Sequence, residues 1–170
     1  RADKMAAAEE FPGGPAYEMC AGLAREHKVF IHAGSILEKI PGEERLHNTS
    51  VAFNREGKEV ARYRKIHMFD ITAPDGAKYH ESAAFKPGDQ VITYDCDGVT
   101  VGCAICYDLR FPALYRALAE SGASYIAIPS AFTRQTGEAH WSVLMRAPSL
   151  AKCISPGKRK TGVGIRPPRR

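Results

Sequence analysis

The sequence predicts a layered α/β fold. Three observations carry this prediction: an early amphipathic helix, a run of strands in the first half, and a strand–helix–strand succession in the second half. Such an order of elements is typical of domains in which helices cover a sheet. With 170 residues, 44% of them hydrophobic, the chain is long enough to bury a core.

The first half is expected to form one helix and three strands. Residues 1–14 are polar and contain Gly and Pro, and we expect a loop there. A helix is expected from Pro15, a residue favoured at the first helical position, because apolar side chains then recur at the spacing of one helix face. Strands are expected over 29–33, ended by Gly34, and over 48–54 and 59–65, which pair as a hairpin.

Residues 66–90 show no clear periodicity, and a loop that long inside a domain is usually functional or disordered. Beyond it we expect two strands joined at Asp97-Gly98, a helix with Gly122 as its C-cap, a short strand, and the start of another helix. These five elements cover 91–94, 99–105, 109–120, 125–128 and 138–145.

The basic character of the chain belongs to its last residues. The net charge is +5, but seven positive charges and no acid fall within residues 152–170, which leaves 17 basic against 19 acidic residues elsewhere, a net of −2. Prolines and glycines are frequent in the same segment. We therefore expect a domain over 1–147 and a basic, disordered tail over 148–170, with no nucleic-acid partner, since the tail lacks aromatic residues that stack on bases.

Cysteine usage and hydropathy indicate the compartment. An odd count of five cysteines without a regular framework argues against a secreted disulfide scaffold, and no run of 18 apolar residues encodes a membrane span. The first residues contain no apolar signal segment, and because the first residue is not Met, we expect the record to start inside a longer chain. We expect a cytoplasmic protein without a membrane partner.

Cys106 is the leading candidate for a nucleophile. An apolar strand ends there and a helix begins within a few residues, which places the thiol at the C-terminal end of a strand and near a positive helix end. Both features favour the reactive thiolate. A buried structural cysteine is the equally weighted alternative. Metal or redox use of the Cys103–Cys106 pair is disfavoured, because no second cysteine pair exists to complete a site.

Two further segments carry candidate charges. Lys65, at the end of a predicted strand, could stabilise an oxyanion, although taken alone a solvated basic stretch at a sheet edge is the more favoured explanation. Glu81, in the long loop, could pair with Lys65 and orient it, or be an exposed acid. His67 by itself is typical of a structural histidine.

Four motifs in order give the sequence a family resemblance. They are Arg-Lys-Ile-His-Met-Phe-Asp at 64–70, Glu-Ser with Pro-Gly-Asp at 81–89, Gly-x-x-Ile-Cys-Tyr-Asp-x-Arg-Phe-Pro at 102–112, and Pro-Ser-Ala-Phe with Ala-His-Trp at 129–141. Over residues 10–147 the chain resembles the nitrilase superfamily of carbon–nitrogen hydrolases, and most closely its small amidase branch, the omega-amidases and deaminated-glutathione amidases.

The resemblance implies a fold, a reaction and roles for individual residues. The fold would be an α-β-β-α sandwich, here incomplete, and the reaction would be cysteine-dependent hydrolysis of a small amide through a thioester, with no cofactor and no metal. Cys106, Lys65 and Glu81 would form the catalytic set. Tyr107, Arg110 and Phe132 would contribute the oxyanion N–H, support of the nucleophile loop and a pocket wall. Full-length members commonly form homodimers.

The sequence departs from the family pattern in three places. The general-base glutamate of the family lies in a Pro-Glu context that should precede Arg1, and neither Glu9 nor Glu10 follows an apolar strand. Ser142 stands where a glutamate is expected, and residues 148–170 resemble no part of the family. A catalytically inactive or binding relative is therefore the alternative function.

Overall fold

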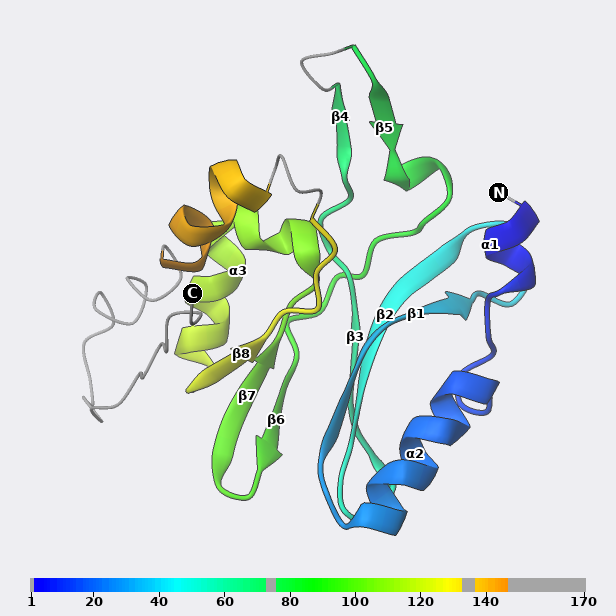
Figure 1. Cartoon of the computed structure of the whole chain (residues 1–170), viewed down its shortest axis with the longest axis vertical. Coiled ribbons are helices and arrows are strands. Elements are labelled where there is room, and N and C mark those ends of the chain that lie inside the picture. The colour runs from blue at the N-terminus through cyan, green and yellow to red at the C-terminus, as the bar shows by residue number, and fades with distance from the viewer. Residues whose placement is uncertain (1, 73–75, 133–136, 147–170) are drawn as a thin grey trace.

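The computed structural model describes residues 2–72, 76–132 and 137–146, and it forms an α-β-β-α sandwich (Figure 1). One sheet has the strand order β1-β2-β3 and the other has the order β6-β7-β8. Helix α2 covers the outer face of the first sheet, and helix α3 covers the outer face of the second. The predicted α/β class and the sandwich that the resemblance implied are both confirmed.

The first sheet is antiparallel and carries α2 on one face. Strands β1 (Ile31–Lys39), β2 (Leu46–Phe53) and β3 (Glu59–Arg64) pair in sequence order, so the predicted hairpin is confirmed. Helix α2 (Pro15–His27) begins at the predicted proline. Its buried Tyr17 packs edge-on against the Phe53 ring, with 4.9 Å between ring centroids.

The second sheet combines a hairpin with a parallel strand. Strands β6 (Thr93–Cys96) and β7 (Val99–Cys103) pair around Asp97 and Gly98, which both adopt positive φ, as the tight turns of hairpins require. Helix α3 (Pro112–Glu120) then leads to β8 (Tyr125–Ala127), which runs parallel to β7. A helix between parallel strands packs back on the sheet, and the α3 side chains meet a cluster beside β7.

The sequence-based end of the first strand was wrong. We expected Gly34 to end it, but β1 continues to Lys39 through an irregularity between Ala33 and Ile36. Gly34 instead allows Pro129, in the loop after β8, to lie close to the β1 backbone, because a Cβ added at Gly34 would lie 2.9 Å from the Pro129 Cβ. The missing side chain therefore lets the two sheets approach each other at this point.

Two segments expected to be loops contain short elements. Within residues 1–14, helix α1 (Ala2–Ala6) forms, since alanine favours helix strongly. Within the long segment after β3, strands β4 (Asp70–Thr72) and β5 (Lys78–His80) pair as a hairpin, followed by the 3₁₀ helix η1 (Glu81–Ala83). This hairpin projects beyond the sandwich in Figure 1. The expected absence of regular structure there was wrong.

The helix predicted over 109–120 divides into two. A 3₁₀ helix, η2 (Cys106–Arg110), is followed by α3, which begins at Pro112 because proline is favoured in a first helical turn. Gly122 follows the end of α3 with a φ of 85°, as predicted for a glycine after a helix.

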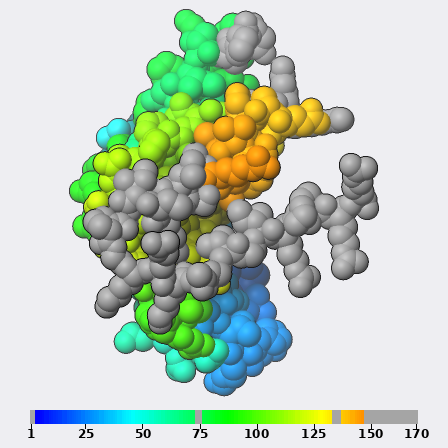
Figure 2. Space-filling view, turned by 90° about the vertical axis from the view of Figure 1, so that its left-hand side faces the viewer, coloured from blue at the N-terminus to red at the C-terminus, as the bar shows by residue number. Residues whose placement is uncertain are grey.

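A last helix spans residues 137–146, in agreement with the predicted helical start. Figure 2 shows it on the surface in orange beside the green segments of the second half. Its Leu144 packs against the cluster beneath α3. The tail predicted over 148–170 lies outside the described residues. Within the described ranges, no helix combines the length and apolarity needed to cross a bilayer.

The interior between the sheets contains a histidine that should make stability depend on pH. Burial lowers the pKa of His32 below its ordinary value of 6.5, and its Nε2 is buried without a hydrogen-bond partner in the described part of the chain. The unfolded chain therefore binds the proton first, so the free energy of unfolding should fall as the pH drops below 6.5. Urea unfolding at pH 7.5, 6.5 and 5.5 measures this slope.

His32→Phe should make that slope shallower, because phenylalanine keeps the stacking on Tyr94 and cannot bind a proton. A residual slope of the same sign is expected from His47, whose pKa burial also lowers. An unchanged slope in His32→Phe would show that His32 does not contribute to the pH dependence.

Candidate active site

Cys106 lies at a sharp turn between β7 and α3. Its φ of 47° falls in the left-handed region, which costs a non-glycine residue about 1–3 kcal/mol and is often found at functional sites. The Cys106 N–H donates a hydrogen bond of 3.0 Å to the carbonyl of Pro129. Pro129 is the residue that packs against Gly34 of β1. The strand-to-helix turn thus presents a partly exposed thiol in a conformation that the surrounding chain imposes.

Lys65 and Glu81 meet directly. Lys65 follows β3 and is only 3% exposed, and its Nζ donates to Glu81 Oε2 at 2.5 Å. The same carboxylate oxygen accepts the Phe69 N–H at 2.6 Å. A buried ammonium needs such a partner, because an unpaired charge in the interior is strongly unfavourable. The structure therefore brings together two of the three residues of the predicted catalytic set.

Cys106 is joined to the Lys65 segment through a shared apolar cluster. Cys106 and Ile66, the neighbour of Lys65, both pack against the cluster between the sheets that includes Tyr63 and Ile105. This packing links the turn after β7 to the chain after β3.

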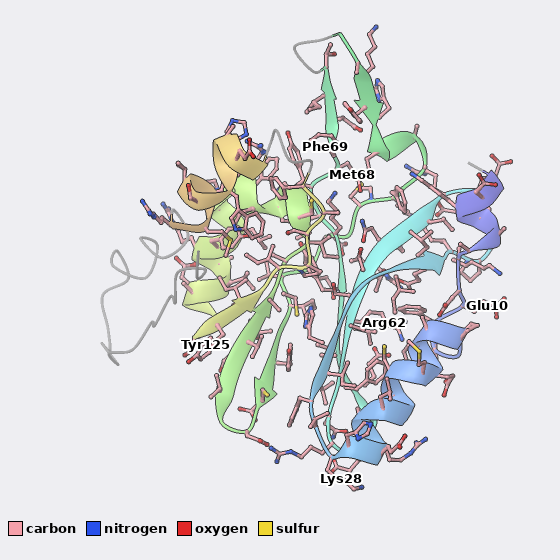
Figure 3. All side chains as sticks on the ribbon, viewed as in Figure 1. Glu10, Lys28, Arg62, Met68, Phe69 and Tyr125 are labelled. Atoms are coloured by element: carbon pink, nitrogen blue, oxygen red, sulfur yellow. The ribbon has the colours of Figure 1, made fainter. Side chains whose placement is uncertain are left out.

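Aromatic rings make a second connection between these segments. Phe69 lies at the base of the β4–β5 hairpin, next to Met68 (Figure 3), and its ring meets the Tyr107 ring edge-on at 4.9 Å. Tyr107 also contacts Phe111 at 5.5 Å. Around the turn, the N–H groups of Cys106 and Asp108 donate to the carbonyl groups of Pro129 and Ile105.

Arg110 and Phe132 lie toward the helix over 137–146. Arg110 Nη2 is 3.1 Å from His140 Nδ1, and the guanidinium lies 5.8 Å from the centre of the Tyr107 ring. Phe132 packs edge-on against Trp141 at 5.2 Å. These two residues therefore connect the turn after β7 and the loop after β8 to the last described helix. Ser142, where the resemblance led us to expect glutamate, is exposed on this helix.

The sequence analysis missed the importance of Asp108. This residue is fully buried, and its carboxylate accepts hydrogen bonds from Tyr63, His67 and Ile105. His67, interpreted as structural, is one of its partners. The signal was a carboxylate two residues after the candidate nucleophile, but only the tertiary fold brings its partners to it.

Three other thiols in the part of the chain that the structure describes are less suited to nucleophilic chemistry. Burial raises the pKa of Cys103 to about 12 and also raises the pKa values of Cys20 and Cys96. Because the thiolate is the nucleophile, these three sulfurs are disfavoured. In the part of the chain that the structure describes, no group of three His, Cys, Asp or Glu side chains could hold a metal ion.

Glu9 has a structural function at the start of α2. Its carboxylate oxygens accept the N–H groups of Ala16 and Tyr17 at 2.9–3.2 Å, at the positive end of the helix. The Glu9 carboxylate is therefore occupied by the backbone at the start of α2.

A hollow of about 270 Å³ lies apart from these candidate residues, and its lining includes Arg62 and Arg64 on β3. Arg64 makes a bidentate pair with Glu38, and Arg62 makes one with Glu59. The carboxylates neutralise both guanidinium groups, so the hollow offers no uncompensated charge from these arginines.

The sequence pattern described as carbon-nitrogen hydrolase matches residues 1–154. The deaminated glutathione amidase of Yersinia enterocolitica is 39% identical over 150 residues, which cover 86% of this chain and 52% of that protein. Omega-amidase NIT3 of Saccharomyces cerevisiae is 38% identical over 130 residues, covering 76% of this chain and 45% of that protein. The chain thus spans about half the length of these relatives.

Solved structures show the same architecture. The crystal structure of Saccharomyces cerevisiae Nit3, described as a member of branch 10 of the nitrilase superfamily, matches with a TM-score of 0.72 at 34% identity, covering 82% of this chain and 49% of that one. An amidase from Nesterenkonia sp. AN1, with acrylamide added at its active-site cysteine, matches with a TM-score of 0.66 at 26% identity, covering 82% and 51%. Sequence and structure together establish that the chain belongs to the carbon-nitrogen hydrolase family.

Proposed function

We propose that the chain carries the nucleophile half of an amidase that hydrolyses the carbon–nitrogen bond of a small carboxylic acid amide. The observation that carries this proposal is the strained turn at Cys106, linked through one apolar cluster to the segment of the buried Lys65–Glu81 pair. Family membership and the amidase names of the relatives support it.

The reaction divides amide hydrolysis into two steps. The Cys106 sulfur attacks the carbonyl carbon, and the Lys65 ammonium and the Tyr107 N–H stabilise the negative oxygen of the tetrahedral intermediate. The carbon–nitrogen bond breaks, the leaving nitrogen takes up the proton that the thiol has lost and departs as ammonia, and a thioester remains. Water then attacks the thioester, which releases the acid and restores the thiol. The Nesterenkonia amidase, whose active-site cysteine adds to acrylamide, supports the assignment of a cysteine nucleophile.

Glu81 orients the lysine in this scheme. Its carboxylate holds Nζ at 2.5 Å and is itself fixed by the Phe69 N–H, so the ammonium has a defined position. Arg110 supports the turn through the Tyr107 ring, and Phe132 forms a wall with Trp141.

The substrate class follows from the relatives. Omega-amidase and deaminated glutathione amidase are names of enzymes that act on amides, and we propose a small monoamide of a dicarboxylic acid as the substrate. The reaction chemistry needs neither a metal nor a cofactor, and a homodimer is the proposed assembly of the full-length protein.

Trapping of the thioester tests the proposal. The chain is mixed with small dicarboxylate monoamides and quenched in acid, and its intact mass is measured. We expect an increase equal to the acyl group, mapped to the peptide that contains Cys106 and removed by hydroxylamine. Ammonia release is measured in parallel.

The competing function is that of a non-catalytic binding relative, because the family's general-base glutamate is assigned to neither Glu9 nor Glu10. An adduct on Cys20 or Cys96 instead of Cys106 would contradict the proposed nucleophile. Binding of the amide with neither adduct nor ammonia would favour the binding relative.

A further inference from the structure

The carboxylate of Asp108 is buried at the junction of the two segments that carry Lys65 and Cys106. Its oxygen Oδ1 accepts the backbone N–H of His67 at 3.0 Å and lies 2.7 Å from His67 Nδ1. Its oxygen Oδ2 accepts the backbone N–H of Ile105 at 2.8 Å and the Tyr63 hydroxyl at 2.7 Å. Asp108 itself is 0% exposed.

These partners surround the proposed catalytic residues in the chain. Ile105 directly precedes Cys106, while Tyr63 and His67 stand two residues before and two residues after Lys65. One carboxylate therefore fixes the backbone on both sides of the site. The Cys106 turn and the Lys65 segment are thus hydrogen-bonded to the same side chain.

All four groups donate to the carboxylate. Two are backbone N–H groups, and the His67 ring must carry its proton on Nδ1 to satisfy an ionised acceptor. Burial, followed by the charge of Asp108, raises the pKa of Tyr63, so the Tyr63 hydroxyl keeps its proton and donates. The His67 ring is also stacked on Phe111, with 3.6 Å between ring centroids, which fixes its orientation.

We propose that Asp108 is a positioning residue, which sets the geometry of Cys106 relative to Lys65 by tying the Ile105 and His67 backbones to a single carboxylate. This inference rests on the proposed function of Cys106 as the nucleophile. Asp108 acts through the backbone and His67, and not by contact with the substrate.

Asp108→Asn is a sharp test because an amide cannot reproduce the bonding pattern. Each carboxylate oxygen accepts one backbone N–H, and a backbone N–H cannot become an acceptor. In either orientation of an asparagine, its NH₂ group would face one of these donors. One backbone bond is therefore lost at the Cys106 side or at the Lys65 side.

The matched control is Glu38→Gln on the opposite face of the first sheet. Glu38 is also a buried carboxylate, 3% exposed, and it accepts from Thr49 at 2.6 Å and from Arg64. Both variants convert a buried, multiply bonded carboxylate into an amide and should lower the thermal midpoint. Only Asp108 contacts the backbone next to Cys106.

The readout is the rate of iodoacetamide modification of Cys106, followed from pH 5 to 10 and mapped by peptide mass, with Cys96 as the internal reference thiol. We expect Asp108→Asn to slow the modification of Cys106 relative to that of Cys96 and to change its pH profile, because the loss of one backbone bond releases either the Cys106 turn or the Lys65 segment. The rate at pH 7 should fall by roughly fivefold to tenfold, the effect of losing about one hydrogen bond. Glu38→Gln should keep the wild-type profile.

A milder variant covers the case in which Asp108→Asn does not fold. His67→Leu removes the ring donor but keeps both backbone bonds, and it should slow Cys106 modification in the same direction by a smaller factor. A wild-type profile in a folded Asp108→Asn, or in His67→Leu, overturns the positioning role. If wild-type Cys106 reacts no faster than Cys96, the failure belongs to the proposed nucleophile instead.

Discussion

Cys106→Ala is expected to lower the rate of ammonia release from a small monoamide by at least about 10³-fold, to the level of a blank without protein. Alanine removes the sulfur that forms the thioester, and no other described thiol can replace it, since burial raises the pKa values of Cys20, Cys96 and Cys103. The measurement is ammonia produced per chain over several hours, together with the intact mass of the protein. The acyl adduct should be absent.

Cys96→Ala is the matched control for this change. Cys96 ends β6 at the hairpin turn, in the sheet whose strand β7 leads to Cys106, but outside the proposed site. Its removal should leave ammonia release at the wild-type rate. Equal rates in wild type and in Cys106→Ala would exclude the cysteine mechanism, whatever the value of that rate.

Lys65→Met should reduce thioester formation by about 10²–10³-fold, the loss typical when one group that stabilises an oxyanion is removed. Methionine has a similar length and fills the space, but it carries no charge. The variant also leaves Glu81 with the Phe69 N–H and without its ammonium partner, so a lower thermal midpoint is expected as well. The rate of adduct formation, measured by quenched-flow mass analysis below the unfolding temperature, separates these two effects.

Lys86→Met provides the comparison. Lys86 Nζ lies 2.6 Å from Glu43, a contact nearly as close as that of Lys65 with Glu81, but both partners are partly exposed, at 42% and 32%. Exposed ion pairs stabilise proteins by about 0–1 kcal/mol, so neither the midpoint nor the adduct rate should change much. A folded Lys65→Met that forms the adduct at the wild-type rate would remove Lys65 from the mechanism.

Local patterns in the sequence predicted most of the elements, because each depends on neighbouring residues. Pro15 begins α2, Gly122 follows α3, and Asp97-Gly98 turns the β6–β7 hairpin. The failures occurred where a contact distant in sequence decided the outcome. Gly34 looked like a strand end, yet it lies within β1, where its lack of a side chain leaves room for Pro129 from the other half of the chain.

The candidate site divides in the same way. The motifs around Cys106, Lys65 and Glu81 are readable in the sequence because residue type and order carry them. The 2.5 Å contact between Lys65 and Glu81, 16 residues apart, confirms that these two side chains pair, while the catalytic roles stay a prediction.

By itself, the sequence determined the family, the strands and helices that short-range periodicity and turn residues specify, and the thiol to test first. Only the tertiary structure decided that Asp108 is the acceptor for four donors, since Tyr63 lies 45 residues away and His67 lies 41 residues away. No local pattern encodes such a convergence. It arises because a carboxylate without solvent must be satisfied by whatever donors the packing of two sheets brings to it.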